Sequence, residues 1–364
     1  MLVTGAPLAE VGKIAALRAN GLGDLVFAVP ALDALRAAYP SAEIVLLARA
    51  WHADFVPGRV PSVDRVVVVP LAQGIWSPPG RPDDPGEVEP FFEAMAAERF
   101  DLALQLHGGG RYSNPFVRGL GARVTAGLRT PDAEPLDHCV PYVYYQSEVF
   151  RMLEVAAAVG APPTGIEPRL TVLEADRGEA AERLGDDGPL AVLHPGATAG
   201  RRRWPPERFA SVGDALSAAG ATVVVTGAAE EAELVEEVVD RMAEPARGQA
   251  GSLSTGGLAA VLSRAAVVVS NDSGPLHVAA ATGAATVGIF WCGNMINAGP
   301  VTRTRHRPAI SWRRSCPACG TDCITGSCEH DESFVADVPL EEVRDSALDL
   351  FVAADRPARR GAAA

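Results

Sequence analysis

Residues 266–290 read AVVVSNDSGPLHVAAATGAATVGIF, and this stretch decides the fold class. Its two ends, Ala266–Ser270 and Ala285–Phe290, are short apolar runs typical of buried parallel strands. Between them, Gly274–Thr282 has the composition of a short helix with a proline in its first turn. A strand, a helix and a second strand in this order form the repeating unit of a parallel α/β sheet.

Similar alternation extends over most of the remaining chain. Further strands are predicted at Lys13–Arg18, Glu43–Ala48, Arg65–Val69, Asp101–Leu106, Pro189–Leu193 and Ala221–Thr226. Helices are predicted after the first strand as far as Ala38, and at Val149–Val159, Pro205–Ala219, Glu230–Met242 and Leu340–Ala353. Loops are expected at Ser77–Pro90 and Cys292–Val338, and the proline-rich stretch Thr130–Arg169 is expected to connect two domains.

The length of 364 residues exceeds what one hydrophobic core usually supports, so two domains are expected. The restart of the α/β pattern after the proline-rich stretch divides the chain into residues 1–165 and 166–340, both Rossmann-like. Residues 341–364 are expected to form a terminal helix and a tail. The predicted class is α/β, with two parallel sheets facing each other across a cleft.

Composition narrows the function. Hydrophobic residues make up 48% and charged residues 21%, which is typical of a globular protein. The net charge of −13 argues against a nucleic-acid groove, because binding phosphodiester backbones favours a basic face. Lys13 is the sole lysine, so the lysine of a nucleotide-binding P-loop is missing. No apolar run reaches about 20 residues and no secretory signal precedes the first strand, so we expect a cytoplasmic protein without a transmembrane segment.

The first candidate site is Gly21-Leu22-Gly23-Asp24, between the first strand and its helix. Ligands bind at this edge of parallel sheets, and Gly21 and Gly23 allow a close backbone approach. Asp24 is placed to accept a proton from an acceptor hydroxyl as a general base. On the motif alone, however, helix capping explains Asp24 better than catalysis does.

Two further sites lie at strand ends of the second half. After Leu193, a glycine-containing loop carries Thr198 and three arginines, among them Arg202, a composition that suits a diphosphate better than a solvated turn. After Ser270, the motif Asn271–His277 opens a helix whose first N–H groups suit a phosphate.

In this second motif Ser273 and Gly274 would face the phosphate, and Asp272 would orient a sugar hydroxyl or cap the helix. A ligand role for His277 is as well supported as a structural one. Glu230 follows another strand, where nucleotide folds hold ribose hydroxyls. Its favourable charge at the start of an acidic helix is a strong alternative explanation. The sites together predict a phosphate-bearing donor on the second domain and an acceptor on the first.

The motifs GLGD, HPGA…RRRWPPERF, TGAAEEAEL and SNDSGPLHVAAA, in this order, resemble the heptosyltransferase-like glycosyltransferases of family 9. The resemblance spans about residues 13–350, including the cysteine-bearing CPACGTDCITGSC and the later PLEEV. It implies the GT-B fold and an inverting, metal-independent transfer of a heptose or related hexose from a nucleotide diphosphate.

Carried over by motif, the resemblance makes Asp24 the general base, and Thr198 and Arg202 the groups that hold the diphosphate. It assigns the ribose to Glu230. The donor phosphates and sugar would then contact Asp272, Ser273, Gly274 and His277.

The resemblance favours an ADP-sugar, although Phe290–Asn294 departs from the family's usual GPT-like loop and leaves the base open. His107 and Arg111 are the acceptor-side candidates beside Gly21 and Gly23. The acceptor class stays open among a saccharide, a lipid-linked saccharide, which would bring peripheral membrane contact, and a small molecule.

Four cysteines, Cys316, Cys319, Cys323 and Cys328, crowd into thirteen residues with His330 nearby. Their spacing permits a structural zinc ion, and free thiols or a disulfide formed on purification explain them equally well. No cofactor is expected in the reaction itself. Besides sugar transfer, two readings stay open: a nucleotide-sugar epimerase or hydrolase, and a non-catalytic nucleotide-sugar-binding protein.

Overall fold

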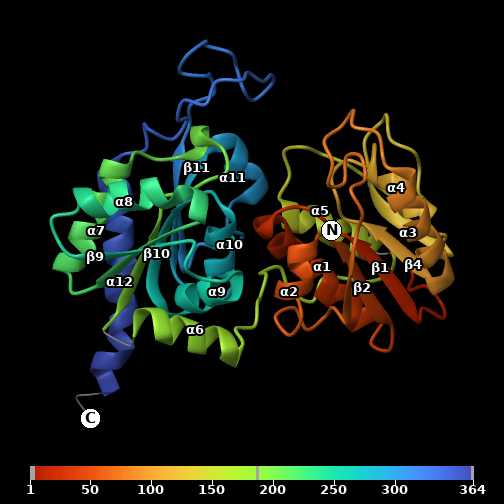
Figure 1. Ribbon diagram of the computed structural model, residues 1–364, viewed down its shortest axis with the longest axis horizontal. Helices are drawn as coiled ribbons and strands as arrows, with labels where there is room; N and C mark the ends of the chain where they lie inside the picture. Colours follow the sequence, from red (N-terminus) through yellow and green to blue (C-terminus); the bar gives the residue numbers. More distant parts are fainter. Residues whose placement is uncertain (1–4, 186–187, 362–364) are drawn as a thin grey trace. The chain divides into compact units, whose positions relative to one another are not determined.

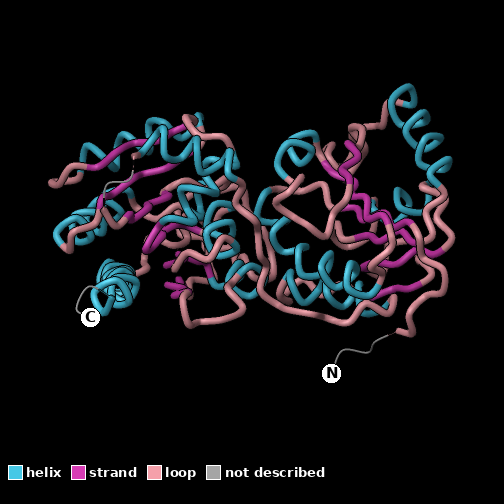
Figure 2. Tube along the Cα trace, turned by 90° about the horizontal axis from the view of Figure 1, so that it is seen from below, coloured by secondary structure: helices cyan, strands magenta, loops and turns pink. Residues whose placement is uncertain are grey.

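The computed structural model describes residues 5–185 and 188–361. The chain forms two compact units, the first ending at Thr171 and the second beginning at Val172. Each unit holds a six-stranded, wholly parallel sheet with helices on both of its faces (Figures 1 and 2). These two sheets confirm the predicted α/β class.

The sheet of the first unit has the strand order β3-β2-β1-β4-β5-β6. Its strands are β1 (Lys13–Leu17), β2 (Glu43–Ala48), β3 (Arg65–Val68), β4 (Leu102–Gln105), β5 (Val124–Arg129) and β6 (His138–Pro141). Its helices are α1 (Leu22–Ala38), α2 (Ala50–Phe55), α3 (Pro85–Glu98), α4 (Ser113–Gly119) and α5 (Glu148–Ala158). Helices α1 and α5 pack against each other, while Phe91 and Phe92 of α3 contact Phe116 of α4 in a separate aromatic cluster.

The sheet of the second unit has the order β12-β11-β10-β7-β8-β9. Its strands are β7 (Leu190–His194), β8 (Thr222–Gly227), β9 (Ala246–Ala250), β10 (Ala265–Asn271), β11 (Thr286–Trp291) and β12 (His306–Ser311). Its longer helices are α6 (Glu174–Leu184), α7 (Pro206–Ala218), α8 (Ala232–Arg241), α9 (Thr255–Arg264), α10 (Gly274–Ala281), α11 (Cys292–Ala298) and α12 (Leu340–Gly361), with short 3₁₀ turns at Gly200–Arg202 and Ala229–Glu231.

The sheets are buried on both faces, which is why their central strands read as continuous apolar runs rather than alternating ones. Strand β7 is fully buried, and β10 is buried at all but one position. Helix α12 packs against α7 and β10, with Val343 and Ala347 in the same core as the strands. The terminal helix therefore belongs structurally to the second unit.

Three of the predicted irregular stretches contain regular elements. Helix α3 begins inside the loop expected at Ser77–Pro90, because the Asp84 side chain accepts from Gly86 N at 2.9 Å and Pro85 suits a first helical turn. Strand β6 was not expected in the stretch thought to connect the domains, whereas helix α5 confirms the helix predicted there at Val149–Val159. Both elements belong to the first unit. Helix α11 and strand β12 lie within the loop expected at Cys292–Val338. These segments were expected to be irregular because they are rich in proline or cysteine, although each also contains a short apolar pattern.

Within the described residues, every helix is too short or too polar to cross a membrane.

Candidate functional site

The loops that follow β7, β8, β10 and β11 meet at one edge of the second sheet. Parallel strands bring their carboxyl ends to a single edge of the sheet. These four strands lie side by side in the order β11-β10-β7-β8. The predicted donor-side residues all lie in these loops or at the start of the helix that follows. The structure therefore brings together motifs that are up to about 80 residues apart in sequence.

Asp272 is the centre of this edge. Its side chain is 4% exposed and takes part in three polar contacts. Asn294 Nδ2 donates to Oδ2 at 2.6 Å, His277 Nε2 lies 3.3 Å from Oδ1, and an Arg202 guanidinium nitrogen lies 3.5 Å from Oδ2 and 3.3 Å from the backbone oxygen. One buried carboxylate thus contacts three side chains from three segments: Arg202 from the 3₁₀ turn after β7, His277 from α10 and Asn294 from α11.

These partners also keep Asp272 ionised. Burial by itself would raise the pKa of a carboxyl group, because it disfavours the charged form. The hydrogen bond and charge of His277, the charge of Arg202 and the hydrogen bond from Asn294 together outweigh burial and hold the pKa of Asp272 below its usual range. The site therefore keeps a negative charge in its interior at neutral pH.

Asn271, a residue that the sequence analysis did not single out, ties two of the loops together. Its Oδ1 accepts from Trp204 N at 3.0 Å and its Nδ2 donates to Pro195 O at 2.7 Å. The side chain is fully buried, so losing it would leave two backbone groups without their partner. The signal available in the sequence was an asparagine at the end of a buried strand, next to the predicted Asp272.

The start of α10 presents Ser273 and Gly274 as expected. Ser273 occupies the N-cap position, but its hydroxyl lies 3.2 Å from Ser270 Oγ and does not cap the helix. Because the Ser273 hydroxyl does not bond to them, the N–H groups in the first turn of α10 remain available to an anion. Thr198, by contrast, is exposed in its loop. Its contact with a phosphate stays a prediction.

The carboxylate that faces the glycine loop after β7 is that of Glu231, not of Glu230. Glu231 Oε2 accepts from Ala228 N at 2.9 Å, and Oε1 lies 3.8 Å from an Arg203 nitrogen. A side chain at Gly196 would meet this carboxylate at 2.2 Å. Glu230 is exposed at the neighbouring position. The role of Glu230 at the ribose therefore stays a prediction, and Glu231 is a second candidate beside it.

His194 closes β7 as a neutral side chain. It is 4% exposed, and burial lowers its pKa to about 4, with only a small opposing effect from Glu231 and Thr226. Its Nδ1 lies 3.1 Å from Thr226 Oγ1. A neutral buried imidazole at a strand end packs and hydrogen-bonds, so we assign it no part in ligand chemistry.

In the first unit, Asp24 is both a helix-capping residue and the partner of a buried arginine. Gly21 N donates to Asp24 Oδ2 at 3.0 Å, and Arg18 lies 2.9 Å from Oδ1. Arg18, which is 2% exposed, also donates to Leu106 O at 2.6 Å and contacts Glu148 at 3.2 Å. The Asp24 side chain remains 41% exposed. The arrangement holds the carboxylate in one orientation and leaves part of it accessible.

His107 interacts electrostatically with Asp24, and its imidazole is buried. Ala19 N donates to its Nδ1 at 3.2 Å, and burial together with the charge of Arg18 lowers its pKa to about 3. Arg111 is largely exposed, with an ion pair to Asp132 at 3.9 Å and its guanidinium 5.5 Å from the Tyr112 ring. Neither contact links Arg111 to Asp24.

Arg49 and His52 complete this edge, and the sequence analysis missed both. Each interacts electrostatically with Asp24, and burial lowers the pKa of His52 to about 4 and that of Arg49 below its usual value. Within the described residues Arg49 Nε is buried without a hydrogen-bond partner, and the guanidinium lies 5.9 Å from the Trp76 ring. Arg49 follows β2 directly, a position that strand ends alone could have flagged.

The cysteine cluster forms a different set from the predicted one. The ligand atoms of Cys316, Cys319, Cys328 and His330 all lie within 4.8 Å of one another. Cys323 is outside this group: its thiol donates to Thr321 O at 3.4 Å and lies 3.9 Å from Cys328 Sγ. The six cysteines all lie in the described part of the chain, and the structure pairs none of them in a disulfide.

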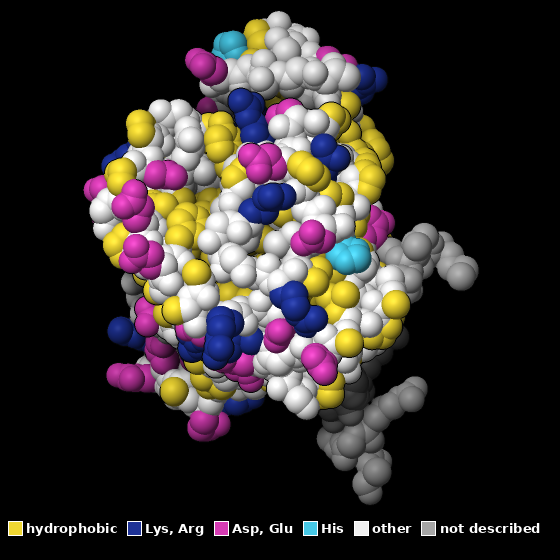
Figure 3. Space-filling model, turned by 90° about the vertical axis from the view of Figure 1, so that its right-hand side faces the viewer, with side chains coloured by type: hydrophobic (Ala, Val, Ile, Leu, Met, Phe, Trp, Pro, Cys, Tyr) yellow, Lys and Arg dark blue, Asp and Glu magenta, His cyan; other side chains and the backbone are white. Residues whose placement is uncertain are grey.

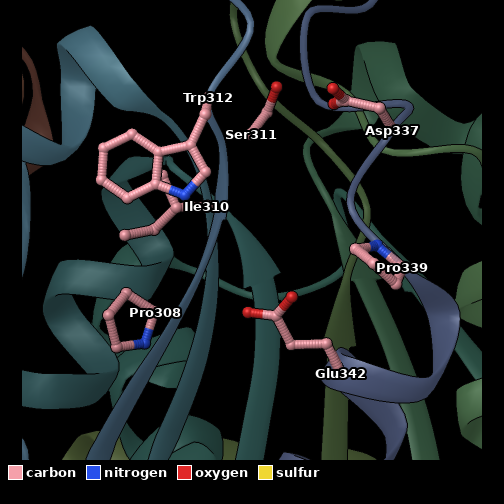
Figure 4. Close-up of a pocket in the computed structure, with 7 residues that line it drawn as sticks. All are labelled: Pro308, Ile310, Ser311, Trp312, Asp337, Pro339 and Glu342. Atoms are coloured by element: carbon pink, nitrogen blue, oxygen red, sulfur yellow. The ribbon is translucent and has the colours of Figure 1, made fainter.

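A pocket of about 360 Å³ lies elsewhere on the second unit (Figure 4). Trp312 lines one side of it, and Asp337 and Glu342 line the other. It contains none of the predicted site residues.

The surface in Figure 3 mixes basic, acidic and apolar side chains, so that face of the molecule gathers no basic patch.

Comparison with known families assigns most of the chain. The model of glycosyltransferase family 9 (heptosyltransferase) matches residues 88–320, more than half of the sequence. Lipopolysaccharide heptosyltransferase 2 of Salmonella typhimurium is 26% identical over 295 residues, covering 76% of this chain and 82% of that protein. The protein of the same name from Escherichia coli is 25% identical over 299 residues, covering 76% and 82%.

A solved structure shares the fold over nearly the whole chain. The glycosyl transferase family 9 protein from Veillonella parvula superimposes with a TM-score of 0.79 at 21% identity, covering 96% of this chain and 100% of that one. ADP-heptose lps heptosyltransferase II of Escherichia coli gives a TM-score of 0.74 at 20% identity, covering 94% and 99%. These likenesses confirm the predicted fold class.

Proposed function

The chain belongs to glycosyltransferase family 9, and from this we propose that it transfers a heptose, or a related hexose, from an ADP-sugar to a hydroxyl of a lipopolysaccharide-type acceptor. The relatives named lipopolysaccharide heptosyltransferase 2 support this choice of donor sugar and acceptor. The reaction is an inverting displacement, in which the acceptor hydroxyl attacks the anomeric carbon as the nucleoside diphosphate leaves.

The observation that carries the proposal is the grouping of Arg202, His277 and the start of α10 around buried Asp272. The leaving diphosphate gains negative charge in the transition state, and prearranged positive groups and N–H dipoles stabilise that charge without reorganising. Arg202 offers a planar pair of donors to phosphate oxygens. Asp272 holds Arg202 and His277 in place through its hydrogen bonds and ion pair.

Glu231 is our choice for the ribose hydroxyls. Its carboxylate lies against Gly196, where any side chain would displace it from the loop after β7. The same carboxylate is oriented by Ala228 N and Arg203. An ionised, oriented acceptor suits two neighbouring hydroxyl donors.

Asp24 is our choice for the general base on the acceptor side. The hydroxyl must lose a proton as it attacks, and a partly exposed carboxylate held by Arg18 and Gly21 N is positioned to take it. Arg49 supplies a positive group near Asp24 for an anionic substituent of the acceptor. Because arginine and helix N–H groups stabilise the diphosphate, we propose that the reaction requires no added divalent cation.

The experiment is a thermal-shift panel of nucleoside diphosphates and nucleotide sugars on the wild type, His277→Ala and a control, His138→Ala in β6. We expect ADP and ADP-heptose to stabilise the wild type and the control, and the His277→Ala variant to lose most of that shift. Turnover is then followed as ADP release from ADP-heptose, with and without Mg²⁺. Binding without turnover on any lipopolysaccharide-type acceptor would favour a nucleotide-sugar-binding protein, and stabilisation by another base alone would overturn the ADP assignment.

A further inference from the structure

The segment between β12 and α12 contains a group of side chains that the proposed reaction does not use. This segment is the blue loop at the top of Figure 1. Three thiols and one imidazole, those of Cys316, Cys319, Cys328 and His330, come within 4.8 Å of one another. A tetrahedral zinc ion with Zn–S bonds of about 2.3 Å separates its sulfur ligands by roughly 3.8 Å. The four side chains are therefore already near the spacing that such an ion requires.

The backbone around the first two cysteines is shaped for this purpose. Gly320 N donates to Cys316 O at 2.9 Å, and Gly320 has a φ of 74°, so the turn closes at a residue that tolerates the left-handed region. The same turn keeps Cys316 and Cys319, three residues apart in sequence, within reach of one ion.

A short hairpin supports the same turn. Cys316 N donates to Thr321 O and Cys323 N donates to Arg314 O, both at 2.9 Å. Asp322 completes the hairpin through an ion pair with Arg314. The turn is thus held by its own backbone, and Cys323 serves the hairpin rather than the group of four.

We propose that Cys316, Cys319, Cys328 and His330 bind one Zn²⁺ ion. The ion fastens the segment that supports the donor loop, by which we mean residues 195–205 between β7 and α7. Four protein ligands fill a tetrahedral site and leave no position for a substrate or water, so the ion is structural. Three thiolates with one imidazole favour zinc over magnesium or calcium, which prefer oxygen ligands.

The chain immediately after His330 is bound to the donor loop. Asp331 Oδ1 accepts from Arg201 N at 3.1 Å, Phe334 N donates to Arg201 O at 2.8 Å, and Ser333 Oγ donates to Arg203 O at 2.6 Å. These three contacts lie on either side of Arg202 in sequence. Fixing His330 on a metal therefore fixes the backbone that positions Arg202.

The other end of the segment is anchored at the same edge of the sheet. Trp291 Nε1, at the end of β11, donates to Arg313 O at 2.6 Å, three residues before Cys316. Both ends of the segment thus lie at the candidate donor site, and the zinc ion would join them. This consequence for the donor loop rests on the proposed function, whereas the metal site itself does not.

The test begins with the metal content of the full-length protein, purified in reductant without chelator. We expect one zinc per chain in the wild type, in Cys139→Ser, whose cysteine lies in the first unit, and in Cys323→Ser. Removing a group that only supports a metal ligand costs 10–100-fold in affinity, so Cys319→Ser and His330→Ala should weaken zinc binding at least about tenfold in a chelator competition. Replacing zinc with Co²⁺ should give thiolate-to-cobalt absorption.

Four outcomes would overturn the site: no zinc in the wild type, iron in its place, zinc held equally by Cys319→Ser, or zinc lost in Cys323→Ser but kept in His330→Ala. The tether is tested by limited proteolysis of residues 312–335 and by ADP affinity, before and after zinc is removed. We expect faster cleavage and weaker ADP binding, both restored by Zn²⁺. Full zinc with unchanged ADP affinity after its removal would overturn the tether alone, and zinc with no ADP binding at all would overturn the proposed function instead.

Discussion

The two units differ in which charged side chain is buried where the strands of each sheet end. At the edge of the second sheet, the carboxylate of Asp272 is buried and contacts side chains from the segments that follow β7, β10 and β11. At the edge of the first sheet, Asp24 is 41% exposed, and it is the arginine beside it, Arg18, that is buried. The same fold thus places a buried anion at one site and a buried cation at the other.

The difference follows from what each site would do. A donor site that must hold a diphosphate needs cations aimed outward, and a buried carboxylate orients them from behind. A base must reach a substrate proton, so its carboxylate has to stay accessible while a buried cation fixes its direction. In each ion pair the buried partner, Asp272 or Arg18, holds the other in one orientation. The more exposed partner, Arg202 or Asp24, is the one that would contact substrate.

The largest effect that separates the two sites is expected from Asp24→Asn. General-base catalysis contributes roughly 10²–10⁴-fold, so kcat should fall by about that factor. ADP affinity, measured by calorimetry, should stay within about twofold, because Asp24 lies in the first unit.

The amide oxygen of asparagine can still accept from Gly21 N, and Arg18 keeps its contact with Glu148, so the fold should survive this substitution. Turnover within a few-fold of the wild type would reduce Asp24 to a capping residue, which is the role that its hydrogen bond from Gly21 N already shows.

An intermediate effect is expected on stability from Asp272→Asn. Removing one charge from a buried, paired group costs about 3–5 kcal/mol, because Arg202 and His277 lose their partner. Denaturant unfolding at pH 7 measures this loss. Asp240→Asn, at an exposed position of α8, should change the free energy of unfolding by less than about 0.5 kcal/mol.

The pH dependence of unfolding in the wild type and in Asp272→Asn tests whether the network stabilises the ionised form of Asp272. In the folded protein, despite burial, the pKa of Asp272 is held below its ordinary value of 3.8 by His277, Arg202 and Asn294. Its stabilising contribution is therefore complete above that value and is lost as pH falls through the folded pKa. The gap in unfolding free energy between wild type and Asp272→Asn should be constant near neutral pH and narrow below about pH 4. A gap that widens on acidification would contradict the network.

The smallest effect, and the sharpest comparison, is between two adjacent glutamates. Glu231→Gln should weaken ADP binding about tenfold, since a hydrogen bond to a charged group contributes about 1.5–3 kcal/mol. Glu230→Gln should change it by less than about twofold, because its side chain is exposed. Titration calorimetry of both variants measures the two losses of ADP affinity. A larger loss in Glu230→Gln than in Glu231→Gln would assign the ribose to Glu230.

The elements that the sequence predicted well are those with unbroken local patterns. Strands β2 and β10 and helix α1 lie within a residue or two of their expected bounds, because each is an apolar run or a periodic helix set off by turn residues. Strands β5 and β9 were missed, since VTAGLR and ARGQA carry glycine or charge and owe their pairing to neighbouring strands. Burial of such edge-side segments is a property of the sheet, not of the segment.

The sequence by itself determined the α/β class, the family and the loops that carry the site, because strand ends and glycine motifs are local signals. Tertiary structure alone decided which side chain within each loop faces the site. It turns Glu231 rather than Glu230 toward the loop after β7, groups His330 rather than Cys323 with three thiols, and pairs Arg18 with Asp24. One residue along a helix turns a side chain by about 100°, so a motif locates a site to within a turn, and only packing sets its direction.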